Sequence, residues 1–218
     1  VESDEQDFRT KLTDGEMEAV LLLQAILTQY ELLIGGEEMW GGKIANMFPR
    51  PEIGRMCSEF SHAELCSHAP FYKIGNVVLR RDTDEFYNSW EDNPVLAAHI
   101  SYINKVASSD NPLKVTAALC FLEGVVLFSA FAFFKSFNTG GFNLIPHFVS
   151  GIDASAKDEN FHSMGSAWLY NTCKSERLEL GLLTVEDEAE LSNIIEELIS
   201  NTVSHEFAII DMLFEHGE

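Results

Sequence analysis

Basic residues are scarce in this chain of 218 residues, which carries 14 lysines and arginines against 35 aspartates and glutamates. The formal net charge is therefore −21 at pH 7. A surface of this kind repels the phosphate backbone of nucleic acids and the anionic headgroups of a membrane. We expect neither nucleic acid nor a membrane as a partner.

Cysteines are also few, and no two of them form a Cys-x-x-Cys pair. The four are Cys57, Cys66, Cys120 and Cys173. This pattern excludes a small disulfide scaffold and favours a reducing, cytoplasmic compartment. The first five residues are acidic and polar, so the sequence shows no secretory signal peptide.

No segment shows the convincing alternation of a β-strand, so we predict an all-α fold. The longest apolar run, 115–134, is long enough for a transmembrane helix, but Glu123 lies within it and no basic cluster flanks it. A glutamate in an apolar helix is costly to bury unless it is paired or binds a metal. The run is therefore predicted to be a core helix of a bundle.

The chain divides into helical segments separated by breaks rich in glycine, proline and asparagine. The predicted helices cover residues 14–34, 37–47, 51–76, 84–90, 94–107, 115–137, 144–172 and 184–214, the last in one or two pieces. Thr13 or Asp14 would cap the first helix and Thr184 the last, whereas Pro70 should kink the helix that contains it. A single domain, residues 1–218, accommodates them all.

Four glutamates and two histidines occur in these helices in a regular order. They are Glu31, Glu64 with His68, Glu123, and Glu159 with His162. A bundle that binds two metals takes one glutamate from each of two helices and a Glu/His pair from each of the other two. Four carboxylates would also balance the charge of two divalent cations, which explains how they can be buried.

The spacing of these residues predicts the topology. Glu31 and Glu64 are 33 residues apart and Glu123 and Glu159 are 36 apart, as in antiparallel helical hairpins. The 59 residues between Glu64 and Glu123 leave room for additional helices. Two hairpins joined by one long crossover are typical of ferritin-like bundles.

Each member of the set has a simpler interpretation when it is taken alone. Glu159 and His162 form a Glu-x-x-His pattern that surface helices show by chance, and Glu31 would suit a solvated helix end. Glu59 and His62 form a competing Glu-x-x-His pattern one turn before Glu64 and His68 in the same helix. The order of all six residues favours a metal site.

Tyr72 follows His68 by four residues, one turn further along the same face of the helix. A tyrosine beside two metals and surrounded by apolar groups can be oxidised to a radical that is shielded from water. The plainer alternative is a core tyrosine with a hydrogen-bonded hydroxyl. The position beside a predicted ligand favours the radical.

Several segments resemble the radical-bearing small subunit of class I ribonucleotide reductase, in particular its bacteriophage-type members. The segments are His68-Ala69-Pro70-Phe71-Tyr72 followed by Asp84-Glu85-Phe86-Tyr87, Phe121-Leu122-Glu123-Gly124 followed by Ser129-Ala130-Phe131-Ala132-Phe133, Asp158-Glu159-Asn160-Phe161-His162-Ser163, and Thr28-Gln29-Tyr30-Glu31. The resemblance extends from about Asp14 to Gly217, and the combination of segments is specific.

The resemblance implies a role for the residues at the matching positions. Two metals, iron or manganese or a mixed pair, would be held with some bridging carboxylates, the first by Glu31, Glu64 and His68 and the second by Glu123, Glu159 and His162. Tyr72 would carry the radical and Asp158 would belong to the radical-transfer path. The pocket around the radical would be formed by Leu127, Phe131 and Ser155.

The activity implied by the resemblance is the small subunit's part in ribonucleotide reduction. The metals would activate dioxygen and oxidise Tyr72, and the radical would pass to a separate large subunit that makes deoxyribonucleotides. The resemblance also implies a homodimer. Two alternative functions share the ligand set: a ligand-binding oxidase, and an iron-storage or peroxide-detoxifying protein, which has no use for Tyr72. A metal-free helical interaction protein is a further alternative.

Some residues depart from the family pattern. Glu31 stands where the family usually has aspartate, and Glu64 precedes His68 by four residues instead of three, which an extra residue in a helical bulge would explain. The first tryptophan is Trp40, although the family has one before the first ligand, and the last tyrosine is Tyr170, although the family's tail carries one. We expect both chain ends to be trimmed and the radical-transfer route to be incomplete.

Overall fold

Helices form all the regular secondary structure in the computed structural model, which describes residues 1–215. The last three residues of the predicted domain, including Gly217, lie outside the described residues. Within residues 1–215 there is no strand, and the all-α prediction is confirmed.

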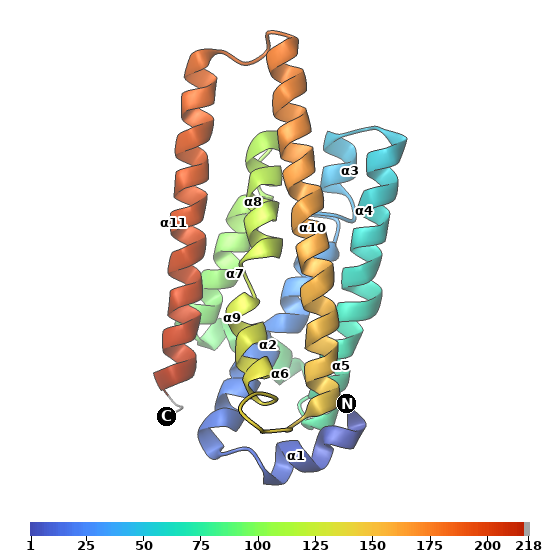
Figure 1. The fold of residues 1–218 in the computed structure, drawn as a ribbon, viewed down its shortest axis with the longest axis vertical. Coiled ribbons are helices and arrows are strands. Elements are labelled where there is room, and N and C mark those ends of the chain that lie inside the picture. The colour runs from blue at the N-terminus through green and yellow to red at the C-terminus, as the bar shows by residue number, and fades with distance from the viewer. Residues whose placement is uncertain (216–218) are drawn as a thin grey trace.

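Two helical hairpins and a long crossover build the bundle (Figure 1). The first hairpin pairs α2 with a second arm of three consecutive elements, and the second pairs α8 and α9 with α10. The hairpin elements are α2 (Asp14–Gly35), α4 (Pro51–Ala63), η2 (Glu64–His68), α5 (Ala69–Val78), α8 (Pro112–Gly124), α9 (Phe128–Ser136) and α10 (Pro146–Glu179). This is the predicted ferritin-like topology.

The remaining helices cover or connect these hairpins. The crossover carries α6 (Asp84–Asn88), η3 (Ser89–Asp92) and α7 (Pro94–Ala107). The others are η1 (Glu2–Asp4), α1 (Glu5–Thr10), α3 (Lys43–Met47) and α11 (Val185–Glu215). The long α11 runs as one helix and packs against α7, α8 and α9. In Figure 1 the loop from α10 to α11 lies at the opposite end of the molecule from α1.

Local sequence signals set several helix ends. Thr13 and Glu16 form a capping box at the start of α2, in which each side chain bonds the backbone of the other residue. Asn93 and Asn111 cap α7 and α8, and each is followed by a proline in the first helical turn, where the missing N–H is not needed.

Glycines on α10 allow its neighbours to approach closely. A Cβ atom on Gly151 would lie 2.2 Å from the ring of Phe71, and one on Gly165 would lie 2.7 Å from the ring of Phe60. Both rings belong to the second arm of the first hairpin. The two glycines therefore let aromatic side chains pack directly against the α10 backbone.

The predicted helix 115–137 is wrong in one respect, because it is two helices. α8 ends at Gly124, and α9 begins at Phe128 after a break in which Leu127 has a left-handed backbone with φ of 78°. Gly124 lies directly before the break and is the only local sign of it, since no glycine or proline occupies residues 125–127. Other helices contact the residues on both sides of it, as described below.

Two helical stretches, Asp14–Gly35 and Pro112–Ser136, are long and apolar enough to span a membrane if only length and composition are considered. In the fold both pack in the centre of the bundle, and each contributes a buried glutamate, Glu31 or Glu123. Their apolar composition is that of core helices with an internal polar site.

Candidate metal centre

Six buried side chains from four parts of the bundle converge on one polar site inside the apolar core. They are the predicted set Glu31, Glu64, His68, Glu123, Glu159 and His162, each at most 3% exposed. Their donor atoms form two groups, and within each group all donor atoms lie within 4.8 Å of one another. The first group holds Glu31, Glu64, His68 and Glu159, and the second holds Glu64, Glu123, Glu159 and His162.

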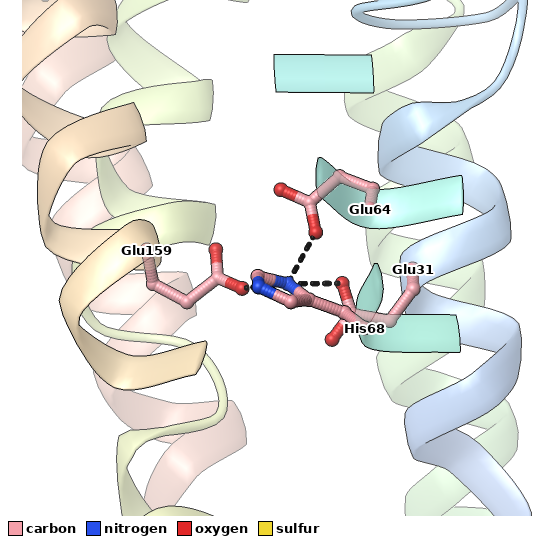
Figure 2. A group of neighbouring side chains, drawn as sticks. All are labelled: Glu31, Glu64, His68 and Glu159. Atoms are coloured by element: carbon pink, nitrogen blue, oxygen red, sulfur yellow. Dashed lines mark hydrogen bonds and ion pairs between the residues drawn. The ribbon is translucent and has the colours of Figure 1, made fainter. Parts of the chain in front are cut away.

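Glu64 and Glu159 belong to both groups, as expected of carboxylates that bridge two metals. Figure 2 shows the first group, with Glu159 reaching from α10 toward Glu31, Glu64 and His68 on the other hairpin. Both hairpins therefore supply ligand atoms to each group.

The four-residue spacing between Glu64 and His68 is explained by a π-helical turn. Residues Glu64–His68 form a π-helix between α4 and α5, and the Ala69 N–H bonds the Glu64 carbonyl five residues earlier. A π-turn absorbs one extra residue in a helix. Both side chains therefore face the site, with His68 Nδ1 2.7 Å from Glu64 Oε2.

Gly35 lets α2 approach this π-turn. A Cβ atom on Gly35 would lie 2.5 Å from the Cβ atom of Glu64, closer than real side chains come. The Ser61 hydroxyl also donates a hydrogen bond to the Gly35 carbonyl at 2.7 Å. The end of α2 is thus fixed against the residues that precede Glu64.

The imidazole of His68 faces several carboxylates. Its Nδ1 atom lies 3.1 Å from Glu159 Oε1 and 3.8 Å from Glu31 Oε2. Its Nε2 atom lies 3.2 Å from Asp158 Oδ2, on the outer side of the ring. A carboxylate on the second nitrogen of a metal-binding histidine holds the ring orientation and tautomer.

Many of the atoms in the site that could bind a metal have no hydrogen-bond partner. Both carboxylate oxygens of Glu31 and of Glu159 and one oxygen of Glu123 are buried and accept no hydrogen bond, although some of them lie near His68. His162 Nδ1 and Glu64 Oε1 lie 2.6 Å apart without normal hydrogen-bond geometry. Unpaired buried oxygens are costly, and convergent ones are the ligands that divalent cations bind. The residues present therefore fit two metal ions.

The pKa values of the buried carboxyl and imidazole groups also show that the site requires positive charge. Burial, and then the charge of Glu159, raise the pKa of Glu31 and of Glu123 well above the usual range. Burial also raises the pKa of Glu64, but contacts with His162 and His68 outweigh it and bring that pKa to about 2. Burial lowers the pKa of His162, and Glu159 and Glu64 raise it to about 9. Without metals, protons must supply the balancing charge.

Trp40 contacts the site, a contact that sequence reasoning missed. Its side chain is fully buried, and its indole N–H donates a hydrogen bond to Glu123 Oε1. The bond holds one oxygen of Glu123 and leaves the other free. The predicted helix 37–47 is mostly a turn before α3, and this turn brings Trp40 under the site.

The competing pair, Glu59 and His62, lies outside the site. Both side chains are exposed on the outer face of α4. Asp158 differs from the six buried residues, because its side chain is 53% exposed while it contacts His68. It connects the buried site to the surface.

Tyr72 lies on α5, one turn beyond His68, and is fully buried. Its hydroxyl makes no hydrogen bond of normal geometry, although Ser155 lies close enough to favour the ionised form. Burial first, and then the charge of Glu31, raise the pKa of Tyr72 well above 10. Leu127, Phe131 and Ser155, the residues expected around it, are all buried.

Comparison with known families gives a match over the whole chain. The family described as ribonucleotide reductase, small chain, matches residues 1–218. This chain belongs to that family. Together with the two groups of donor atoms, membership makes the protein an oxidoreductase of the ferritin-like di-metal type. Comparison with curated proteins found no match.

Solved structures with the same fold include R2-like ligand-binding oxidases. A variant with a reconstituted Mn/Fe cofactor is 18% identical with a TM-score of 0.70, covering 98% of this chain and 73% of that one. A variant with an Fe/Fe cofactor is 19% identical with a TM-score of 0.71, covering 99% and 73%. At this identity the similarity shows a common fold.

Proposed function

We propose that this chain is the radical-generating small subunit of a ribonucleotide reductase. The observation that carries the proposal is Tyr72, which lies one turn beyond His68, is fully buried and is close enough to Glu31 to feel its charge. A buried hydroxyl that makes no hydrogen bond of normal geometry is costly, so its presence at this depth favours a chemical role over a structural one. Storage or peroxide detoxification would give the hydroxyl no role.

Glu31, Glu64, His68, Glu123, Glu159 and His162 would hold the two metals, with Glu64 and Glu159 bridging them. Two iron ions, or manganese in one or both positions, would supply the reduction of dioxygen and the oxidation of Tyr72. Several divalent metals suit this ligand set, so availability decides between them. The Mn/Fe and Fe/Fe cofactors of the structural relatives support this range of metals.

The chain's own residues orient and protect this chemistry. Trp40 holds Glu123 and Asp158 holds His68, so one ligand in each group has a fixed direction. Leu127 and Phe131 belong to the apolar core, which keeps water from Tyr72. Asp158 reaches the surface and would connect the site to a large subunit that reduces ribonucleotides.

The structural relatives suggest an oxidase as the second candidate function. They are named ligand-binding oxidases, but the similarity to them extends only to the fold. An oxidase needs the same metals and dioxygen, so metal content alone does not separate the two functions. A stable radical on Tyr72 does.

The test is electron paramagnetic resonance of the ferrous protein after exposure to oxygen. We expect a tyrosyl signal in the wild type and none in Tyr72→Phe, with two metals bound per chain in both. The phenylalanine keeps the ring and removes only the oxidisable hydroxyl, so the core should survive. Tyr170→Phe, at a partly buried tyrosine of α10 that belongs to neither ligand group, is the matched control and should keep the signal. A fully loaded wild type without a radical would favour the oxidase.

A further inference from the structure

The break between α8 and α9 is a conformation that its own residues do not explain. Val125, Val126 and Leu127 include no turn-forming residue, and Leu127 has a left-handed backbone that residues with side chains rarely adopt. Such a conformation persists only where the surrounding structure holds it. Contacts from other helices must therefore stabilise the break.

On the α8 side of the break, the hydrogen-bond ladder shifts by one residue. The Val126 N–H bonds the Phe121 carbonyl at 3.2 Å, whereas a continuous α-helix would use the Leu122 carbonyl. The freed Leu122 carbonyl accepts a hydrogen bond from the Tyr30 hydroxyl at 2.5 Å. A side chain from α2 thus satisfies the carbonyl that the break releases.

On the α9 side, the new helix start needs an acceptor for its first N–H groups. Leu127 stands at the capping position, and its apolar side chain cannot accept a hydrogen bond. Glu206 of α11 takes this role: its Oε2 atom accepts from the Ser129 N–H at 3.2 Å and from the Ser129 hydroxyl at 2.6 Å. A carboxylate is also favoured at the positive end of the helix dipole.

The buried carboxylate of Glu206 is explained by its bonds to the start of α9 and not by a part in the metal centre. Its side chain is 8% exposed, and its carboxylate accepts hydrogen bonds from the N–H and the hydroxyl of Ser129. Burying a carboxylate is costly unless it accepts hydrogen bonds, so its presence here is tied to the start of α9. It lies on a helix that contributes none of the six proposed ligands.

The break matters for the metal centre because Glu123 is the residue before the last of α8. A continuous helix through residues 112–136 would carry Glu123 and Ser129 along one straight axis. The observed break interrupts this helix after Gly124 and releases the Leu122 carbonyl, which accepts a hydrogen bond from the Tyr30 hydroxyl. The position of Glu123 therefore depends on whether the break is kept.

We propose that Glu206 is a positioning residue for the metal centre, which caps α9, keeps the break and so holds Glu123 where it completes the second ligand group. The proposal depends on the proposed function in one respect, the identity of the metal ions that this group binds. Glu206 contacts neither the donor atoms nor Tyr72.

The experiment is a calorimetric titration of the metal-free protein with Mn²⁺. Glu206→Met keeps the length of the side chain but removes the hydrogen-bond acceptor. We expect one of the two metal equivalents to bind about tenfold more weakly in this variant, because losing a residue that orients a ligand typically lowers metal affinity by at least this factor. The other equivalent should be unchanged. Glu206→Gln keeps an acceptor oxygen and should bind both metal equivalents with the affinity of the wild type. Glu190→Met, at an exposed position on the same helix, is the matched control.

Hydrogen exchange at the Ser129 amide gives a second readout, and it should become faster in Glu206→Met and not in Glu206→Gln. Wild-type binding of both equivalents in Glu206→Met would overturn the proposal, as would a Glu206→Gln protein as weak as Glu206→Met. Should Glu206→Met not fold, Ser129→Ala removes only the hydroxyl bond and must weaken the same equivalent. Neither readout involves oxygen or Tyr72, so a missing radical with normal metal binding would count against the proposed function alone.

Discussion

At the scale of single residues, His99 is a buried titratable group outside the metal centre. It lies on α7 at 2% exposure, and neither ring nitrogen has a hydrogen-bond partner. The rings of Tyr30 and His205 face it, with centroids 6.4 Å and 5.8 Å away. Burial first, and then the facing His205, lower the pKa of His99 to about 4. Its imidazole is therefore neutral at pH 7.

This shift predicts a loss of stability in acid. The folded pKa lies below the unfolded value of about 6.5, so the unfolded state binds the proton first as the pH falls. The contribution is complete above pH 6.5 and decreases as the pH falls toward 4, by up to roughly 3 kcal/mol. We expect His99→Phe to lack this part of the pH dependence in urea unfolding between pH 7 and pH 4.5. The exposed His62→Gln is the control, and an unchanged pH dependence in His99→Phe would contradict the assignment.

At the scale of elements, the π-turn and the end of α2 determine where Glu64 lies. The π-turn places Glu64 and His68 on the same face despite their four-residue spacing. Gly35 provides the space that α2 needs to reach this turn. The two features act together, because a side chain at residue 35 would push against Glu64 itself.

We therefore predict that Gly35→Ala destabilises the protein by about 1–3 kcal/mol, as overpacked cores usually do, and weakens metal binding. Gly54→Ala on α4 is the matched control, since a Cβ atom there meets nothing within 4 Å. Removing glycine from an open helical position should stabilise it by up to about 1 kcal/mol. Thermal unfolding with and without Mn²⁺ measures both effects. A Gly35→Ala protein as stable as Gly54→Ala would contradict the prediction, because it would mean that α2 can move away from Glu64 without loss of stability.

The elements also show which parts of the structure the sequence could predict. The boundaries of α7 agree with the prediction because Asn93 and Pro94 mark its start locally. The convergence of the six side chains could be predicted because charged groups inside apolar helices are costly to bury without partners. The prediction misses the break because it places Gly124 within a continuous helix, and the groups that bond the residues around the break, Tyr30 and Glu206, are distant in sequence. Trp40 was missed for the same reason, because no local pattern shows which side chain meets Glu123.

At the scale of the whole molecule, the high negative charge and the exposed apolar side chains act in opposite directions. The net charge of −21 repels a second copy of the chain. One face of α10 exposes Phe161, Met164 and Trp168, which are 63%, 61% and 53% accessible. Their spacing of three and four residues places them along one side of the helix. Apolar residues exposed in this way favour association.

We predict a homodimer whose affinity increases with ionic strength, because salt screens the repulsion between the two chains but leaves apolar contacts intact. Sedimentation equilibrium at low and at moderate salt measures both the stoichiometry and its salt dependence. Trp168→Ser should weaken the dimer if α10 forms part of the interface. A monomer at high micromolar concentration in moderate salt would exclude the dimer.

The sharing of Glu64 and Glu159 between the two ligand groups has a consequence for the chain as a polymer. Glu64 belongs to the first half of the chain and Glu159 to the second, and each proposed metal position draws on both halves. Each ion would therefore act as a cross-link that closes a long loop, as a disulfide does in secreted proteins. Unlike a disulfide, such a cross-link forms in a reducing compartment and opens when the ion leaves. The ions that carry the chemistry would also hold the two hairpins together.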